Sequence, residues 1–200
     1  MSVIVEFADI RDSTWWATGP TVQWIVDRHA DLPVLGATGQ ILLWDENDDD
    51  AEEPTIEAGT IHITKPYLWA GKDPLEAMDD VSGDHAALAC AILSEGSYDE
   101  AFGEWFEKTF GIMAGGDPIF VDDIDIRPEF RTPLDGIAAH AVIEAVAAFG
   151  GPDSPIIGYG HELVAEEIRE ECRKRGLWDW EKPLGAKPWH DVLVAARPQR

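Results

Sequence analysis

Residues 119–158 read IFVDDIDIRPEFRTPLDGIAAHAVIEAVAAFGGPDSPIIG and predict a strand, a turn, a helix and a second strand. Apolar residues alternate with aspartates towards the end of Ile119–Ile126, which indicates a strand. Gly136–Phe149 is so rich in Ala, Val and Ile that we expect a helix buried on most sides. Gly150-Gly151-Pro152 ends that helix, and Pro155–Gly158 predicts a short apolar strand. A strand that enters a helix through a glycine-containing turn offers backbone N–H groups and a positive dipole end, which suit a pyrophosphate.

The remaining periodic segments complete an alternation of strands and helices. Strands are predicted at Ser2–Phe7, Gln40–Trp44, Thr60–Thr64 and Asp191–Ala196. Helices are predicted at Thr14–Arg28, with a break or kink at Gly19-Pro20, and at Pro74–Leu93, Tyr98–Phe110 and Glu162–Arg175. We therefore predict one α/β (α+β) domain over residues 1–200, with a mixed, mostly antiparallel central sheet and helices on both faces.

The charge balance is strongly acidic, with 39 Asp and Glu against 15 Lys and Arg and a formal net charge of −24. This charge repels nucleic acids and anionic membranes, so neither is an expected partner. Three interpretations of the charge stay open: ordinary solubility, adaptation to a salty cytoplasm, and docking to a basic surface. The sequence has no apolar run of membrane-spanning length, and Glu6 and Asp9 lie where a signal peptide is apolar, so we expect a cytoplasmic protein.

Metal-binding patterns are weak in this sequence. Its two cysteines, Cys90 and Cys172, lie in predicted helices and provide neither a disulfide framework nor a zinc site. The acidic run 45–53 has alternating oxygen ligands, but Asp50 and Ile56 occupy the places where a calcium loop needs Gly and Glu. We expect no metal site.

The strand–turn–helix segment resembles the hallmark of the GNAT N-acetyltransferase superfamily, V-x-P-x-x-R-G-x-G-x-G/A. The matching positions are Ile126, Pro128, Arg131, Gly136 and Ala138. The resemblance extends over about Gln40–Arg197 and is strongest between residues 120 and 177. It implies a GNAT-like fold and an acyl-CoA-dependent N-acyltransferase, most simply an N-acetyltransferase, in which an amine attacks the thioester directly within a ternary complex.

The resemblance also implies where acetyl-CoA, the co-substrate, would bind. The coenzyme-binding residues carried over are Ile124, Ile126, Arg131, Asp135, Gly136, Ile137 and Ala138. A backbone N–H of the strand near the two isoleucines would polarise the thioester carbonyl. The loop departs from the hallmark here, since Leu134 occupies the place of a loop glycine and Gly136 follows five positions after Arg131.

Two aspartates are candidates for the base that accepts the proton of the attacking amine. Asp123 and Asp125 project from the same face of the predicted strand, and two like carboxylates so close would raise the pKa of one of them. A purely structural interpretation stays open, in which both line a solvated cleft edge or pair with Arg127 or Arg131.

Three residues are candidates for the acid that protonates the leaving thiolate. Cys172 occupies the position at which the family commonly has a tyrosine, and a cysteine on a buried helix face is also typical of inert packing. Tyr159 and His161 lie near the end of a predicted strand and are alternatives by position. The altered loop and Cys172 also suit a second hypothesis, an inactive GNAT-fold protein that acts as an acidic interaction module for a basic partner.

Histidines and tryptophans add little to these assignments. His140 is interpreted as a satisfied core residue, whereas His29, His85 and His190 show no spacing typical of a ligand site. The nine tryptophans are mostly expected in the core, although a surface cluster would suit a homodimer interface. The acidic balance favours a cationic amine as acceptor, because unlike charges steer encounter.

Overall fold

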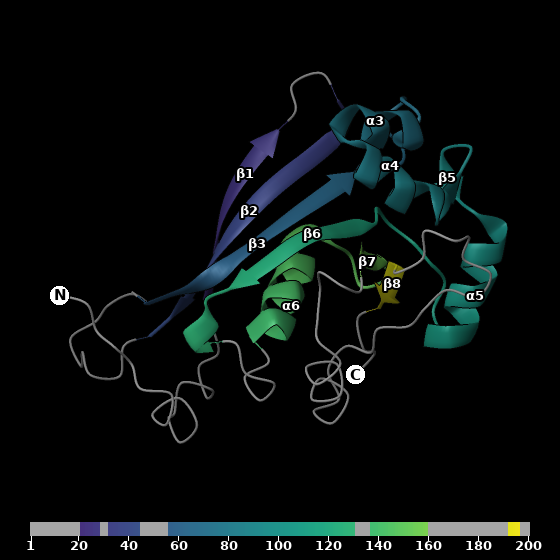
Figure 1. Cartoon of the computed structure of the whole chain (residues 1–200). Helices are drawn as coiled ribbons and strands as arrows, with labels where there is room; N and C mark the ends of the chain where they lie inside the picture. The colour runs from purple at the N-terminus through teal and green to yellow at the C-terminus, as the bar shows by residue number, and fades with distance from the viewer. Residues whose placement is uncertain (1–20, 29–31, 45–55, 131–136, 160–191, 197–200) are drawn as a thin grey trace.

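The computed structural model describes residues 21–28, 32–44, 56–130, 137–159 and 192–196. These residues form a six-stranded sheet with the strand order β1-β2-β3-β6-β7-β8, shown in Figure 1. The strands are β1 (Thr21–Arg28), β2 (Val34–Leu43), β3 (Ile56–Pro66), β6 (Ile119–Ile126), β7 (Ile156–Tyr159) and β8 (Val192–Ala195). All neighbours pair in antiparallel fashion except β6 and β7, which are parallel. The expectation of a mixed, mostly antiparallel sheet is confirmed.

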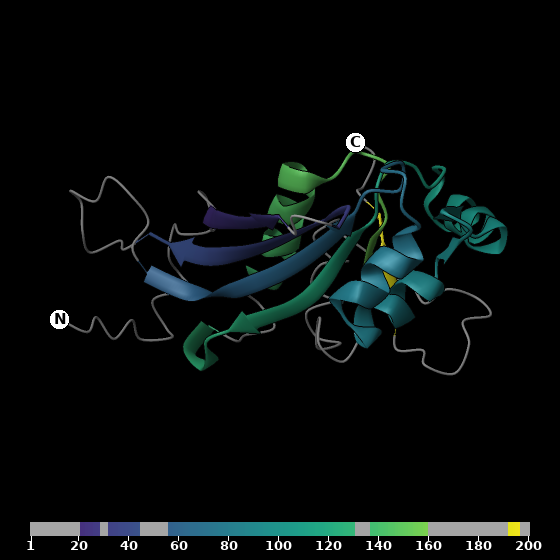
Figure 2. The same ribbon diagram turned by 90° about the horizontal axis from the view of Figure 1, so that it is seen from above.

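Helices cover both faces of this sheet, as Figure 2 shows. The elements outside the sheet are α3 (Pro74–Val81), α4 (Gly83–Cys90), the hairpin β4 (Leu93–Ser94) and β5 (Ser97–Tyr98), α5 (Glu100–Phe110), the short 3-10 helix η1 (Pro128–Phe130) and α6 (Ile137–Phe149). One face, called the α6 face below, packs against α6. The opposite face, called the α4 face, packs against α3, α4 and α5.

Strand alternation separates the two hydrophobic cores. Ile61 and Ile63 of β3 are buried in the core under α6, together with Val142 of that helix. Phe120 of β6 and Ile157 of β7 are buried in the other core. Because successive side chains of a strand point to opposite faces, Thr60, His62 and Thr64 of β3 belong to the α4 face. Polar groups of the central strands therefore meet the helices of that face. 

Helix α5 shows how the sequence fixes one of the covering elements. The side chain of Asp99 accepts a hydrogen bond from the backbone N–H of Phe102, which caps the first turn. Gly111 ends the helix with φ of 72°, a left-handed conformation that glycine adopts without strain. Phe102, Trp105 and Phe106 recur at helical spacing and are buried, so this helix anchors the core of the α4 face.

Two secondary-structure predictions are wrong. Thr21–Arg28 forms strand β1 instead of the end of a helix, because its β-branched residues pair along their whole length with β2. The single helix predicted over Pro74–Leu93 is two helices, since Ser82 is extended between them and caps the second. The strand predicted at 2–7, the rest of the first helix and the helix predicted at 162–175 lie outside the described residues.

Candidate functional site

The predicted coenzyme-binding residues lie on β6 and α6, as far as the structure describes them. Ile126 is buried at the end of β6, and Ile124 is partly buried in the same core. Ile137 and Ala138 are buried in the first turn of α6. Arg131, Asp135 and Gly136 lie outside the described residues. The side chains of the described four therefore contribute to packing, and only their backbone groups can face a ligand.

Within the described ranges, the parallel strands β6 and β7 pair at their beginnings. Their register joins Ile119 to Ile156, Phe120 to Ile157 and Val121 to Gly158. β6 then continues for five more residues, 122 to 126, alongside β3. Among the described residues, the parallel pairing therefore joins the beginnings of the two strands.

The predicted catalytic carboxylates lie on that second half of β6. Asp123 and Asp125 are both exposed and alternate with Ile124 and Ile126, which face the α6 core. The two aspartates consequently share the α4 face. Tyr159 is the last residue of β7 and pairs with Val192, and its side chain is outside the description. Cys172 and His161 lie outside the described residues, and Arg127 pairs with Glu57 at 3.0 Å.

A β-bulge interrupts the pairing of β3 with β6 at the residue after Val121. Ile63 is opposite Val121 and His62 is opposite Asp123, so Asp122 is the extra residue. A bulge turns a side chain out of its regular direction. Here it lets Asp122 reach the same face as its neighbour Asp123, and Asp122 is bonded there to groups from two other elements.

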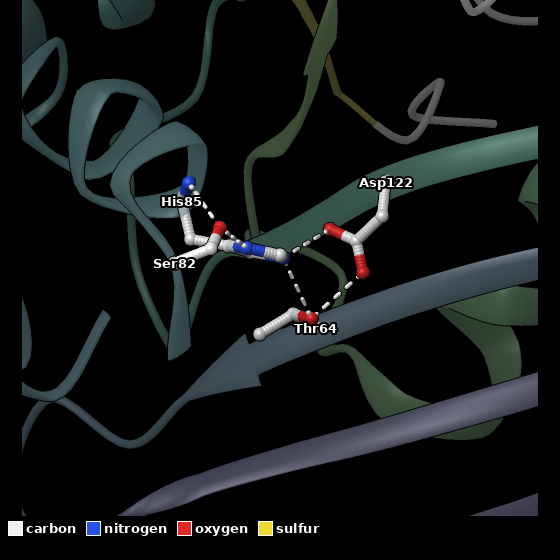
Figure 3. A network of polar contacts seen from close by, with 4 residues as sticks. All are labelled: Thr64, Ser82, His85 and Asp122. Atoms are coloured by element: carbon white, nitrogen blue, oxygen red, sulfur yellow. Dashed lines mark hydrogen bonds and ion pairs between the residues drawn. The ribbon is translucent and has the colours of Figure 1, made fainter. Parts of the chain in front are cut away.

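Asp122, His85 and Thr64 form a closed polar network on the α4 face (Figure 3). Nε2 of His85 lies 2.9 Å from Oδ1 of Asp122 and 3.1 Å from Oγ1 of Thr64. The Thr64 hydroxyl donates to Oδ2 of Asp122 at 2.7 Å. Thr64 is 5% exposed, and the His85 and Asp122 side chains are 18% and 21% exposed. Both carboxylate oxygens are thus held from neighbouring elements in a half-buried setting.

Ser82 extends this network on the other side of the imidazole ring. Its Oγ lies 2.6 Å from Nδ1 of His85. Figure 3 shows Ser82 beside the ring, on the side away from Asp122. The same oxygen accepts the backbone N–H of His85 at 3.2 Å, which makes Ser82 the N-cap of α4. Both nitrogens of the ring are therefore engaged, one with a hydroxyl and the other with a carboxylate.

The protonation of His85 follows from these contacts. Burial lowers the pKa of His85, but the hydrogen bond and charge of Asp122, with a smaller contribution from Asp84, outweigh burial and raise the pKa above its usual value. In the neutral ring, a proton on Nε2 satisfies the Asp122 carboxylate and leaves Nδ1 to accept the Ser82 hydroxyl proton. The arrangement can therefore hold one proton on the ring and release it as the pH rises.

Sequence reasoning missed this network. The spacing of His85 in the sequence indicates no site, and the alternation of β6 points to Asp123 and Asp125 instead of Asp122. One signal was present, because two consecutive aspartates break the alternation of β6 and indicate a bulge. The contacts among Thr64, His85 and Asp122 could not be predicted, because these residues are far apart in the sequence.

Two searches of the described residues define what else the site contains. Within the ranges given above, His, Cys, Asp and Glu side chains form no group of three that could hold a metal ion. None of the helices described there is both long and apolar enough to cross a membrane. Comparisons of the chain with family models, with curated proteins and with solved structures found no match.

Proposed function

We propose that the chain is a GNAT-like, acyl-CoA-dependent N-acyltransferase, most simply an N-acetyltransferase. The observation that carries the proposal is the parallel pairing of β6 with β7, described from Ile119 and Ile156 to Val121 and Gly158, with β6 continuing to Ile126. The carboxyl ends of parallel strands are the place where open α/β sheets bind ligands. The sequence resemblance to the GNAT hallmark begins at the same strand end.

The helix that follows β6 supports a phosphate-binding role. α6 begins at Ile137, shortly after β6 and η1, and returns the chain to the parallel strand β7. The first N–H groups of a helix have no partner within it, and the helix dipole is positive at that end. The pyrophosphate of acetyl-CoA is the anionic group that such an end binds. Arg131, whose placement is not described, completes this proposal by resemblance alone.

The chemical step is assigned to groups of β6. The exposed Asp123 or Asp125 takes a proton from the amine, directly or through water, as the amine attacks the thioester carbonyl. The bulge at Asp122 changes the direction of the strand backbone, which suits a backbone N–H aimed at the developing oxyanion. Tyr159, His161 and Cys172 remain proposals for the acid that protonates coenzyme A as it leaves.

The acceptor is proposed to be a cationic amine. The chain carries a net charge of −24, and the carboxylates of Asp123 and Asp125 are exposed on the face that a substrate would approach. Opposite charges accelerate encounter between an enzyme and its substrate. Polyamines, aminoglycoside-like molecules and lysine side chains of proteins belong to this class.

Calorimetric titration with acetyl-CoA tests the proposal. We expect micromolar binding that Arg131→Glu abolishes, because the resemblance assigns this arginine to the phosphates. Arg127→Glu is the matched control, since Arg127 is 47% exposed in its pair with Glu57 and has no assigned role in binding. Equal loss in both variants, or no binding to the unmodified protein at millimolar acetyl-CoA, contradicts the proposal.

A second function is favoured by the sequence of the loop. Leu134 replaces the first loop glycine, and the acidic surface suits a basic protein partner. Both facts suit an inactive GNAT-fold protein that acts as an interaction module. Absence of acetyl-CoA binding together with salt-sensitive binding of a basic polypeptide such as poly-lysine would favour this function over the enzyme.

A further inference from the structure

The polar network contains three side chains in the order needed to activate a hydroxyl nucleophile. Ser82 Oγ is 2.6 Å from Nδ1 of His85, and Nε2 of the same ring is 2.9 Å from Oδ1 of Asp122. A serine is a weak nucleophile until an adjacent base takes its proton, and a third group orients that base. We infer that Ser82 is an acyl-accepting nucleophile, with His85 as its base and Asp122 as the group that orients and stabilises the imidazolium.

The nitrogen roles are chemically consistent even though Nδ1, not Nε2, faces the serine. The chemistry needs one ring nitrogen that accepts and one that donates, and either tautomer provides this. Thr64 donates to the second oxygen of Asp122, which fixes the carboxylate and leaves Oδ1 for His85. The serine–histidine–carboxylate constellation is recognised by geometry and roles, not by sequence position.

Helix capping alone does not explain the network. Capping of α4 requires only that Ser82 Oγ accepts the backbone N–H of His85, a contact of 3.2 Å. The imidazole side chain is not needed for that bond. Besides its contact with Thr64, the ring contacts Ser82 and Asp122 of another element, as expected of a base placed between a nucleophile and an orienting carboxylate.

Space and a hydrogen-bond donor lie beside the serine. Gly83 follows Ser82 directly and is exposed, and an ideal Cβ built on it meets no described atom within 4 Å. Gly83 is the first residue of α4, where backbone N–H groups lack partners within the helix. A backbone N–H next to the nucleophile is a suitable donor for an oxyanion. A small ester can therefore approach Ser82 from the side of Gly83.

The inferred reaction is acyl transfer from a carboxylic ester of a small acyl group. Ser82 Oγ bonds to the carbonyl carbon while its proton passes to Nδ1 of neutral His85, and Asp122 stabilises the resulting imidazolium. The bond to the leaving alcohol then breaks. His85 returns the proton to a basic alkoxide, whereas a stable anion such as p-nitrophenolate leaves unprotonated. Water attacks the acyl-Ser82 ester by the same route, which releases the acid and restores the hydroxyl. No coenzyme takes part, so this inference is independent of the proposed acyl-CoA function.

The test uses p-nitrophenyl acetate and the full chain. We expect a burst of p-nitrophenolate of about one equivalent per chain, and peptide mass spectrometry should find the acetyl group on Ser82. Ser82→Ala should abolish both. Ser82→Asn should do the same while keeping a favourable N-cap, so a loss in both variants with intact melting temperatures is not an unfolding effect.

Further variants test the roles of the other two groups. His85→Gln should slow acylation by about a hundredfold or more. Asp122→Asn should slow it too and shift the midpoint of its pH profile to lower pH, because the carboxylate of Asp122 holds the pKa of His85 up against burial, with Asp84 the other charged group acting on the ring. Ser94→Ala, an exposed serine of the β4–β5 hairpin, is the control and should react like the unmodified protein. No burst in the unmodified protein, an acetyl group on any other residue, or a burst that survives Ser82→Ala overturns the inference.

Discussion

Replacing Asp122 by asparagine removes one charge from the network of Ser82, His85, Thr64 and Asp122 and leaves its shape almost unchanged. The amide oxygen can still accept Nε2–H of His85, now 2.9 Å from the carboxylate. Hydrogen bonds to charged groups contribute about 1.5–3 kcal/mol, and neutral ones about 0.5–1.5 kcal/mol. Since the two side chains are only 18% and 21% exposed, solvent screens this difference weakly.

The stability that Asp122→Asn removes depends on pH with a defined sign. The pKa of His85 is raised in the folded chain, because Asp122 outweighs the lowering effect of burial. This contribution to stability is complete below the unfolded pKa of about 6.5 and is lost as the pH rises through the folded value. In Asp122→Asn burial prevails and lowers the pKa, so acid pH favours unfolding there. We expect a loss of about 2 kcal/mol at pH 5 and of about 1 kcal/mol or less at pH 9.

Urea unfolding followed by tryptophan fluorescence at pH 5, 7 and 9 measures these losses. Asp123→Asn is the matched control, because it removes the same charge from an exposed position of the same strand. The difference between the two variants separates the contacts of Asp122 with His85 and Thr64 from the relief of repulsion between the acidic side chains. NMR titration of the His85 ring should also give a lower pKa in Asp122→Asn than in the unmodified protein. A loss that is equal at all three pH values, or that grows towards pH 9, refutes the reasoning.

Three further substitutions test contacts of β3 and the packing of α5. Gly59 faces Ile126, and an ideal Cβ on it would lie 2.9 Å from Cα of that residue and closer still to the β6 backbone, so Gly59→Ala should cost about 1–3 kcal/mol in urea unfolding. Gly103→Ala is the contrasting case, because Gly103 lies within α5 with nothing near its Cβ position and should gain about 0.5–1 kcal/mol. Nζ of Lys65 donates a hydrogen bond to the carbonyl oxygen of Phe149 at 2.7 Å. Lys65→Met removes this bond and should lower the melting temperature. An unchanged melting temperature would contradict the contact.

The strongly periodic segments were the predictable part of the fold. β6 and β8 were predicted to within one residue at each end, and α6 within one residue of its start, because their apolar patterns match a single period. β1 was not predictable in this way. Val22, Ile25 and Val26 recur at a spacing that also fits a helix, and only pairing with β2 decides for the strand.

The candidate site was predictable only where it is local. Asp123 and Asp125 follow from the alternation of one strand, so their shared face could be inferred from the sequence. The network around His85 needs residues 21 and 37 positions apart, which tertiary packing alone brings together. Two consecutive aspartates are a local signal for the bulge at Asp122. No local signal identifies His85 as the partner of that aspartate.

Hydrogen–deuterium exchange with and without acetyl-CoA tests the proposed binding between β6 and β7 most directly. We expect the coenzyme to slow exchange in peptides that cover β6 (Ile119–Ile126) and the first turn of α6 from Ile137, and to leave β1 and β2 unchanged. Such protection would place the coenzyme at the carboxyl end of β6 and the start of α6. Unchanged exchange at saturating acetyl-CoA, or protection confined to other strands, would contradict the proposed function.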